Sequence, residues 1–108
     1  MAELEEDGAS SASIECALDS DPRLIRIRGE VDMSNVVTVE TDLSGALAGH
    51  PASVVFDLSD LQFIDSSGIA VLLRAAEKTD SLRLRNPSSV VQRILEATGL
   101  TDLLPTEP

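Results

Sequence analysis

The residues best suited to chemistry in this sequence are two adjacent hydroxyls, Ser66 and Ser67, which lie between Asp65 and Gly68. A serine hydroxyl can serve as a nucleophile beside a base, or it can cap a helix or turn. The single histidine, His50, lies far from this motif, and no Gly-x-Ser-x-Gly elbow surrounds Ser66. We therefore expect no catalytic residue, and the bare tetrapeptide predicts a cap and a turn.

The flanking residues place the two hydroxyls at a strand-to-helix corner. Val54–Phe56 is short, apolar and largely β-branched, which predicts a buried strand, and a polar crossing follows it. Apolar residues then recur at helical spacing, at Ile69, Leu72, Leu73 and Ala76. Asp65 and the serines fall where the first amides of a helix have no partner. Because α/β sheets present ligand-facing loops at the carboxyl ends of their strands, a site is expected there.

The rest of the chain predicts an α/β fold. We expect further strands at residues 14–18, 24–28 and 81–85, and helices from Asp32 or Ser34 to about Ala48 and from about Ser88 to Gly99. The first two strands should form an antiparallel hairpin, and the 81–85 strand should pair in parallel with Val54–Phe56. Residues 101–104 add a short turn or strand. The result is a mixed sheet of four or five strands with helices chiefly on one face.

Composition limits the domains, partners and location. Residues 1–12 predict a disordered acidic tail, residues 13–104 one domain, and residues 105–108 a disordered end. The net charge of −11, from 19 acidic and 8 basic residues, argues against nucleic acid and anionic lipid as partners. One cysteine, Cys16, and one histidine exclude an internal disulfide and a zinc cluster. We expect a cytoplasmic protein without cofactor or metal and without membrane insertion.

Three blocks of the sequence resemble the STAS family, and within it the free-standing bacterial anti-sigma factor antagonists. The most specific block runs from Val54 to Leu73 and contains Asp65-Ser66-Ser67-Gly68. The others are Glu30-Val31-Asp32 after Gly29, and Ser88–Val91 with Gly99-Leu100. The resemblance covers nearly all of residues 13–104 and implies the STAS fold. Two departures are Ala70, where many relatives have a second glycine, and the lack of a longer terminal helix.

The resemblance also implies a function. Such a protein binds an anti-sigma factor that is a serine kinase, and thereby releases a sigma factor for transcription. The kinase phosphorylates Ser66, rather than Ser67, and a phosphatase acting on Ser66 restores the active form. Glu30, Asp32, Asp65, Ser66, Ser67 and Gly68 are the implied partner-binding residues. The protein is expected to be a monomer or weak dimer.

Two alternatives remain open at this point. A STAS domain can be an accessory subunit of a membrane transporter, docked on its ABC ATPase and not regulated by phosphorylation. Direct nucleotide binding is the third choice, because no Gly-rich loop followed by lysine is present and the surroundings of Ser66 are acidic.

Overall fold

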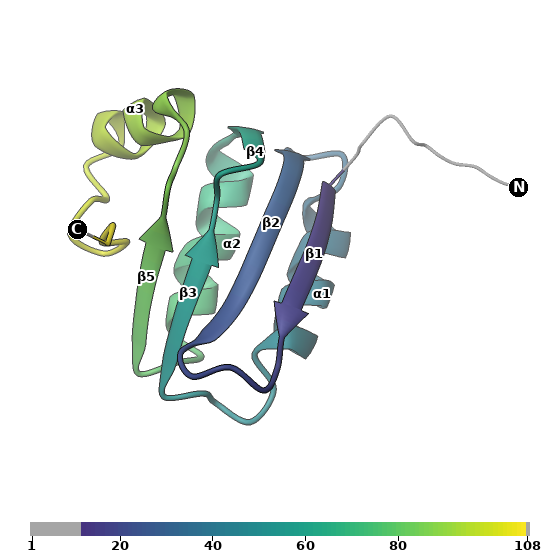
Figure 1. Ribbon diagram of the computed structural model, residues 1–108. Helices are drawn as coiled ribbons and strands as arrows, with labels where there is room; N and C mark the ends of the chain where they lie inside the picture. The colour runs from purple at the N-terminus through teal and green to yellow at the C-terminus, as the bar shows by residue number, and fades with distance from the viewer. Residues whose placement is uncertain (1–11, 108) are drawn as a thin grey trace, which may run out of the picture.

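A mixed β-sheet with two helices behind one of its faces forms the frame of the molecule (Figure 1). The structure is a computed structural model that describes residues 12–107. Its elements in chain order are β1 (Ala12–Ala17), β2 (Arg23–Val31), α1 (Val36–Ala46), β3 (Ser53–Asp57), β4 (Leu61–Ile64), α2 (Ser66–Ala76), β5 (Ser81–Arg85) and α3 (Ser89–Ala97). Residues 1–11 of the predicted acidic tail lie outside the described residues, and Ala12, predicted to be its last residue, is instead the first residue of β1.

The sheet has the strand order β1-β2-β3-β5, and β4 also pairs with β2. The antiparallel hairpin of β1 and β2 and the parallel pairing of β3 with β5 are confirmed. Strand β2 is nine residues long, so its first part pairs with β3 and its last part pairs with β4, both in parallel. The carboxyl ends of the parallel strands therefore share one edge of the sheet.

The segment 57–65, expected to be a polar crossing, contains a strand instead. Leu61 and Ile64 at the two ends of β4 are each 1 % exposed, and the two residues between them are exposed. The two buried residues are three positions apart, which is not the alternation of buried and exposed residues typical of a strand. The periodicity of the sequence therefore did not predict β4. The fifth strand is thus β4, whereas residues 101–104 form a turn.

The first helix begins later and ends earlier than expected. Its N-cap residue is Asn35, so neither Asp32 nor Ser34 caps it, and it ends at Ala46 instead of Ala48. The other two helices match their predicted starts. The Asp65 side chain caps α2 by accepting a hydrogen bond from the Gly68 amide, and Ser88 caps α3 through the Val91 amide.

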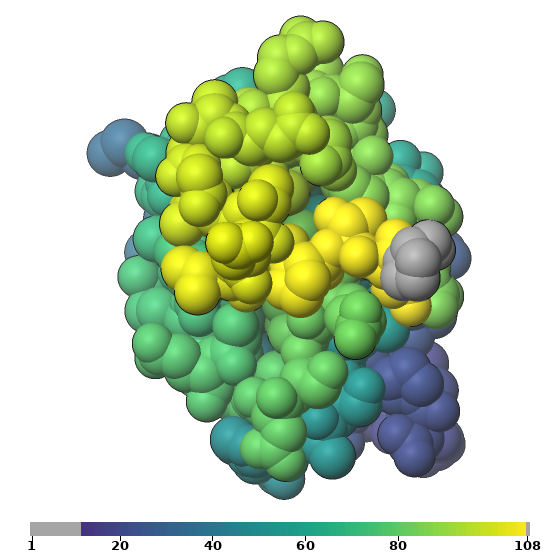
Figure 2. Space-filling model, turned by 90° about the vertical axis from the view of Figure 1, so that its left-hand side faces the viewer, coloured from purple at the N-terminus to yellow at the C-terminus, as the bar shows by residue number. Residues whose placement is uncertain are grey.

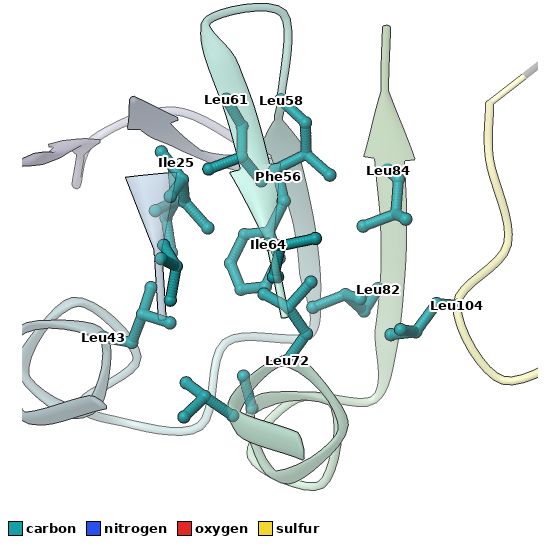
Figure 3. Packing of buried hydrophobic residues seen from close by; sticks show 14 of the residues in the cluster. Ile25, Leu43, Phe56, Leu58, Leu61, Ile64, Leu72, Leu82, Leu84 and Leu104 are labelled. Atoms are coloured by element: carbon teal, nitrogen blue, oxygen red, sulfur yellow. The ribbon is translucent and has the colours of Figure 1, made fainter. Parts of the chain in front are cut away.

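The core lies between the sheet and the helices α1 and α2 (Figures 1 and 3). Phe56, on the central strand β3, is fully buried at its centre. Around it pack Ile25, Leu43, Leu61, Ile64, Leu72, Leu82, Leu84 and Leu104. Helix α3 contacts β4 at the end of the sheet where the parallel strands finish. Within residues 12–107, no helix has both the length and the apolar character needed to cross a membrane.

The C-terminal residues extend the sheet beyond β5. The Leu84 amide donates to the Pro105 carbonyl, and the Glu107 amide donates to the Leu84 carbonyl, each at 2.8 Å. Arg85 also pairs with the Glu107 carboxylate at 2.7 Å. Figure 2 shows the yellow C-terminal residues lying against the green residues of this edge. Backbone hydrogen bonds therefore join residues 105–107 to β5, beyond the domain end predicted at Leu104.

Candidate functional site

The site lies at the edge of the sheet where β2 and β4 end side by side. Val31 is paired with Ile64, and the Asp65 amide donates to the Val31 carbonyl at 3.1 Å. Helix α2 begins one residue later, at Ser66. The structure thereby brings together both sequence blocks that contain the predicted site residues. We call this region the Ser66 edge and define it as residues 30–35 and 63–68.

Asp65 ties the start of α2 to the loop after β2. Its Oδ1 accepts hydrogen bonds from the Ser67 hydroxyl at 2.5 Å and the Gly68 amide at 3.1 Å, and its Oδ2 accepts one from the Met33 amide at 3.2 Å. The Ser67 hydroxyl, followed by these amides, lowers the pKa of the Asp65 carboxyl. The carboxylate therefore stays charged at neutral pH and holds the two segments together.

The two serines of the motif differ in exposure and in hydrogen bonding. Ser67 is partly buried, and its hydroxyl is committed to Asp65. Ser66 is exposed at the first position of α2, and among residues 12–107 its hydroxyl has no hydrogen-bond partner. Of the two, Ser66 alone presents a free hydroxyl to an incoming molecule.

Gly68 lies buried beneath this corner. A Cβ atom there would stand 2.6 Å from Ile64 Cγ1 and 2.9 Å from Val31 Cγ1. A glycine is required because the first turn of α2 packs directly on β2 and β4. The predicted binding residue Gly68 therefore positions the site and offers no side chain to a partner.

Glu30, near the end of β2, and Asp32, on the loop that follows, are the other two carboxylates near Asp65. The Asp32 Oδ1 atom accepts hydrogen bonds from the Ser34 amide and hydroxyl, at 2.9 and 2.5 Å. Asn35 fixes the loop because its side-chain oxygen accepts from the Asp32 amide at 3.0 Å and its side-chain nitrogen donates to the Glu30 carbonyl at 2.8 Å. The Ser66 edge thus carries three carboxylates, those of Glu30, Asp32 and Asp65, and no basic side chain.

Comparison with known proteins identifies the family. The STAS domain family matches residues 13–108. The chain belongs to the STAS domain family. Anti-sigma-F factor antagonist RsfA of Mycobacterium tuberculosis is 33 % identical over 91 residues, covering 79 % of this chain and 71 % of the relative. The crystal structure of an anti-sigma factor antagonist from Mycobacterium paratuberculosis superposes with a TM-score of 0.82 at 25 % identity, covering 94 % of this chain and 89 % of that one.

A third STAS protein has the same fold at lower identity. The Bacillus cell fate determinant SpoIIAA, solved in its phosphorylated form, superposes with a TM-score of 0.64 at 22 % identity. The match covers 89 % of this chain and 92 % of that one. The STAS fold predicted from the sequence is therefore confirmed.

Two exposed apolar residues of this STAS domain were missed by sequence reasoning as site residues. Met33, between Asp32 and Ser34, is 80 % exposed, and Phe63, paired with Glu30 on the neighbouring strand, is 42 % exposed. Large apolar side chains in solvent beside a polar motif often mark a protein-binding surface. The available signal was that Phe63 lies within one matching block and Met33 directly after another, but their exposure follows only from the strand β4 and the loop after β2.

The single histidine of the sequence lies away from the Ser66 edge. His50 lies between α1 and β3, at the opposite end of the parallel strands, where its Nε2 is 2.9 Å from Asp80 Oδ1. Within the described chain, no group of three His, Cys, Asp or Glu side chains could hold a metal ion. The chemistry available at the Ser66 edge is therefore that of an accessible hydroxyl among carboxylates.

Proposed function

We propose that this STAS domain is an anti-sigma factor antagonist that binds an anti-sigma factor serine kinase and so releases its sigma factor. Phosphorylation of Ser66 by that kinase switches the protein off, and a phosphatase reverses it. The observation that carries this proposal is the free, exposed Ser66 hydroxyl next to a Ser67 hydroxyl committed to Asp65. The names of the relatives RsfA and the M. paratuberculosis antagonist support the same function.

The docking surface that we propose for the kinase is the Ser66 edge. Its three carboxylates, Glu30, Asp32 and Asp65, favour a partner with a basic face and speed the encounter with it. Met33 and Phe63 add exposed apolar area, which supplies binding energy when a partner removes it from water. The partner that fits is a protein with basic residues around an apolar patch.

We infer that the phosphate acts at this interface and leaves the fold intact. A phosphoserine adds about −1.5 to −2 charges, and a helix N-terminus stabilises an anion by roughly 0.3–1 kcal/mol. The phosphate therefore has a tolerable position at the start of α2, where Ser66 is exposed. Like charges on Asp65 and Asp32, added bulk and the cost of desolvating the phosphate all oppose docking. SpoIIAA is a STAS protein that has been solved in a phosphorylated form.

The test is to incubate the protein with ATP, magnesium and each candidate anti-sigma kinase from the same genome, followed by intact-mass measurement and site mapping. We expect one phosphate, on Ser66, that is absent from Ser66→Ala and present in Ser67→Ala. The phosphorylated form should no longer bind the kinase, while its amide NMR spectrum should change only near α2.

Two results would contradict the proposal. A phosphate that maps to Ser67 would overturn the assignment of the acceptor. Binding to a transporter ATPase subunit that is unchanged in Ser66→Asp, with no kinase binding, would favour the accessory-subunit alternative.

A further inference from the structure

Besides the Ser66 edge, a second candidate docking surface is the face of the sheet that α1 and α2 do not cover. Arg26 and Arg28 on β2 and Arg83 and Arg85 on β5 alternate with buried core residues, so they point to this open face. Figure 1 shows this face toward the viewer, with α1 and α2 behind the sheet. These four arginines are half of the 8 basic residues in a chain of net charge −11.

We call the surface formed by these four arginines the arginine face. Few of its N–H donors have a hydrogen-bond partner among residues 12–107. Among residues 12–107, Arg28 makes one hydrogen bond, to Glu15 at 3.1 Å, and Arg85 makes two, to Glu107 at 2.7 and 3.3 Å. The Arg26 Nε atom is buried and lacks a hydrogen-bond partner among the described residues. A guanidinium has five N–H donors, so most donors on this face remain available to an anionic ligand.

The carboxylates on this face pair with the arginines but supply few hydrogen bonds. Glu15 lies 3.7 Å from Arg26 Nη1, and Asp60 lies 3.7 Å from Arg28 Nε. Asp57 Oδ2 lies 3.5 Å from Arg26 Nε, which is an ion pair without a hydrogen bond. The Asp57 Oδ1 atom already accepts from the Ser59 amide and hydroxyl. Arg83 is exposed and forms no ion pair within residues 12–107.

Two shallow hollows lie beside the arginines of β2. One, of about 240 Å³, is lined by Glu15, Cys16, Ala17, Leu24 and Arg26. The other, of about 230 Å³, is lined by Ala12, Ser13, Arg28 and Gly29. The second hollow adjoins Ala12, to which the preceding residues of the sequence are attached. A chain that leaves Ala12 therefore starts next to Arg28.

We propose that the acidic segment Glu3–Asp7 of this same chain docks on the arginine face. The segment contains Glu3, Glu5, Glu6 and Asp7 and no basic residue, so its carboxylates can accept hydrogen bonds from the arginine N–H donors that have no partner among residues 12–107. The segment has the necessary reach. Asp7 precedes Ala12 by five residues and Glu3 by nine, which span up to about 17 and 30 Å when extended, whereas β1 and β5 are about 14 Å apart at three strand spacings.

Covalent attachment strengthens the docking without new contacts. A short tether holds the segment at an effective concentration in the millimolar range, so even weak charge-assisted hydrogen bonds are populated. The docked segment covers the open face and withholds its arginines from other anions. This inference concerns the opposite side of the sheet from α2 and does not depend on the role of Ser66.

The test uses the full chain and compares two variants with the same change in net charge. In the tail variant, Glu3→Gln, Glu5→Gln, Glu6→Gln and Asp7→Asn remove four negative charges from the segment. In the control variant, Asp42→Asn, Asp80→Asn, Glu96→Gln and Asp102→Asn remove four charges from exposed positions elsewhere. The readout is the NMR signal of each arginine Nε–H group.

We expect the tail variant to shift the signals of Arg26, Arg28, Arg83 and Arg85 relative to the wild type, and to leave Arg23 and Arg74 unchanged. Raising the salt concentration of the wild type from about 0.05 to 0.5 M should move the same four signals in the same direction, because the charge attraction is screened. The control variant should shift none of the four.

Any of three results would overturn the inference. The four arginine signals could be the same in the tail variant and the wild type. The control variant could shift them as much as the tail variant does. Shifts that grow with protein concentration in the wild type would show that the segment binds a second copy and not its own chain.

Discussion

Two turns at the carboxyl edge of the sheet make similar hydrogen bonds around the sequence Asp-x-Ser and differ in what they expose. In the Leu58 turn (residues 57–59), Asp57 accepts from the Ser59 amide and hydroxyl at 3.0 and 2.8 Å. In the Ser66 turn (residues 65–67), Asp65 accepts from the Ser67 hydroxyl at 2.5 Å and from the Gly68 amide at 3.1 Å. In both turns, an aspartate at the end of a strand fixes the backbone that follows it.

The middle residues of the two turns have opposite environments. Leu58 is fully buried, because the chain after it returns to the sheet as β4 and closes over the core. Ser66 is exposed, because the chain after it enters α2 and its first residue faces solvent. The hydrogen bonds of the aspartate are therefore a structural device common to both turns. The element that follows decides whether the middle residue stabilises the core or is available to a partner.

The largest expected effect comes from truncating the two middle residues. Leu58→Ala removes a fully buried side chain and should lower the free energy of unfolding by about 2–5 kcal/mol. Ser66→Ala should change it by less than about 0.5 kcal/mol, because the side chain is exposed and unpartnered. Urea unfolding followed by circular dichroism measures both. An equal loss of unfolding free energy in the two variants would contradict the conclusion that Leu58 is buried and Ser66 is exposed.

The residue after each turn offers the next comparison. Gly68→Ala places a Cβ 2.6 Å from Ile64 Cγ1, and we expect a loss of about 1–3 kcal/mol from the overpacked helix start. Asp60→Ala, at the corresponding position after Ser59, should cost less than about 1 kcal/mol, since Asp60 is exposed and its ion pair with Arg28 is long, at 3.7 Å. The same unfolding measurement applies. A Gly68→Ala variant as stable as the wild type would show that α2 can shift away from β4.

The structure of the Ser66 turn could be predicted from the sequence, whereas that of the residues around it could not. The cap at Asp65 and the exposure of Ser66 follow from local preferences, because a short acceptor side chain precedes a strongly periodic helix. Local preference does not determine β4. That strand forms because β2 extends beyond the end of β3. The last residues of β2 therefore pair with the chain that follows Leu58.

The start of α1 shows the same limit on prediction from sequence. Asp32, Ser34 and Asn35 are all good capping residues, so preference alone cannot choose among them. The choice depends on the contact of the Asn35 side chain with the Glu30 carbonyl, which exists only once β2 and the loop are in place. The exposure of Met33 and Phe63 likewise depends on tertiary pairing and could not be predicted from their residue types.

The third prediction concerns the hydroxyls that close the two turns. Ser67→Ala and Ser59→Ala each remove one hydrogen bond from a hydroxyl to a carboxylate, so each should lower the free energy of unfolding by about 0.5–1.5 kcal/mol. Chemical denaturation of the two variants beside Ser66→Ala provides the comparison. If Ser67→Ala were as neutral as Ser66→Ala, the Ser67 hydroxyl would not be held by Asp65, and the argument that it is committed would fail.

The smallest expected effect is a dependence of stability on pH at Asp65. Hydrogen bonds from the Ser67 hydroxyl, and then from the Gly68 and Met33 amides, lower the pKa of Asp65 in the folded protein. A lowered folded pKa means that the contribution to stability is fully present above the unfolded value of about 3.9 and is lost as the pH falls through the folded pKa. Asp65→Asn keeps the acceptor for Ser67 and Gly68 but removes the charge and the acceptor for the Met33 amide, which is exposed and can bond to water instead.

We therefore expect Asp65→Asn to be less stable than the wild type by about 0.3–1 kcal/mol at pH 6, because a negative charge at the start of a helix is favourable. The difference should shrink as the pH is lowered from 5 toward 3. Asp57→Asn should show the same trend, because the bonds from Ser59 and the charge of Arg26 outweigh burial and lower the Asp57 pKa as well. Unfolding curves at several pH values would decide. A difference that grows on acidification would mean that Asp65 is stabilised in its protonated form, and the two turns would then differ in their carboxylates as well as in their middle residues.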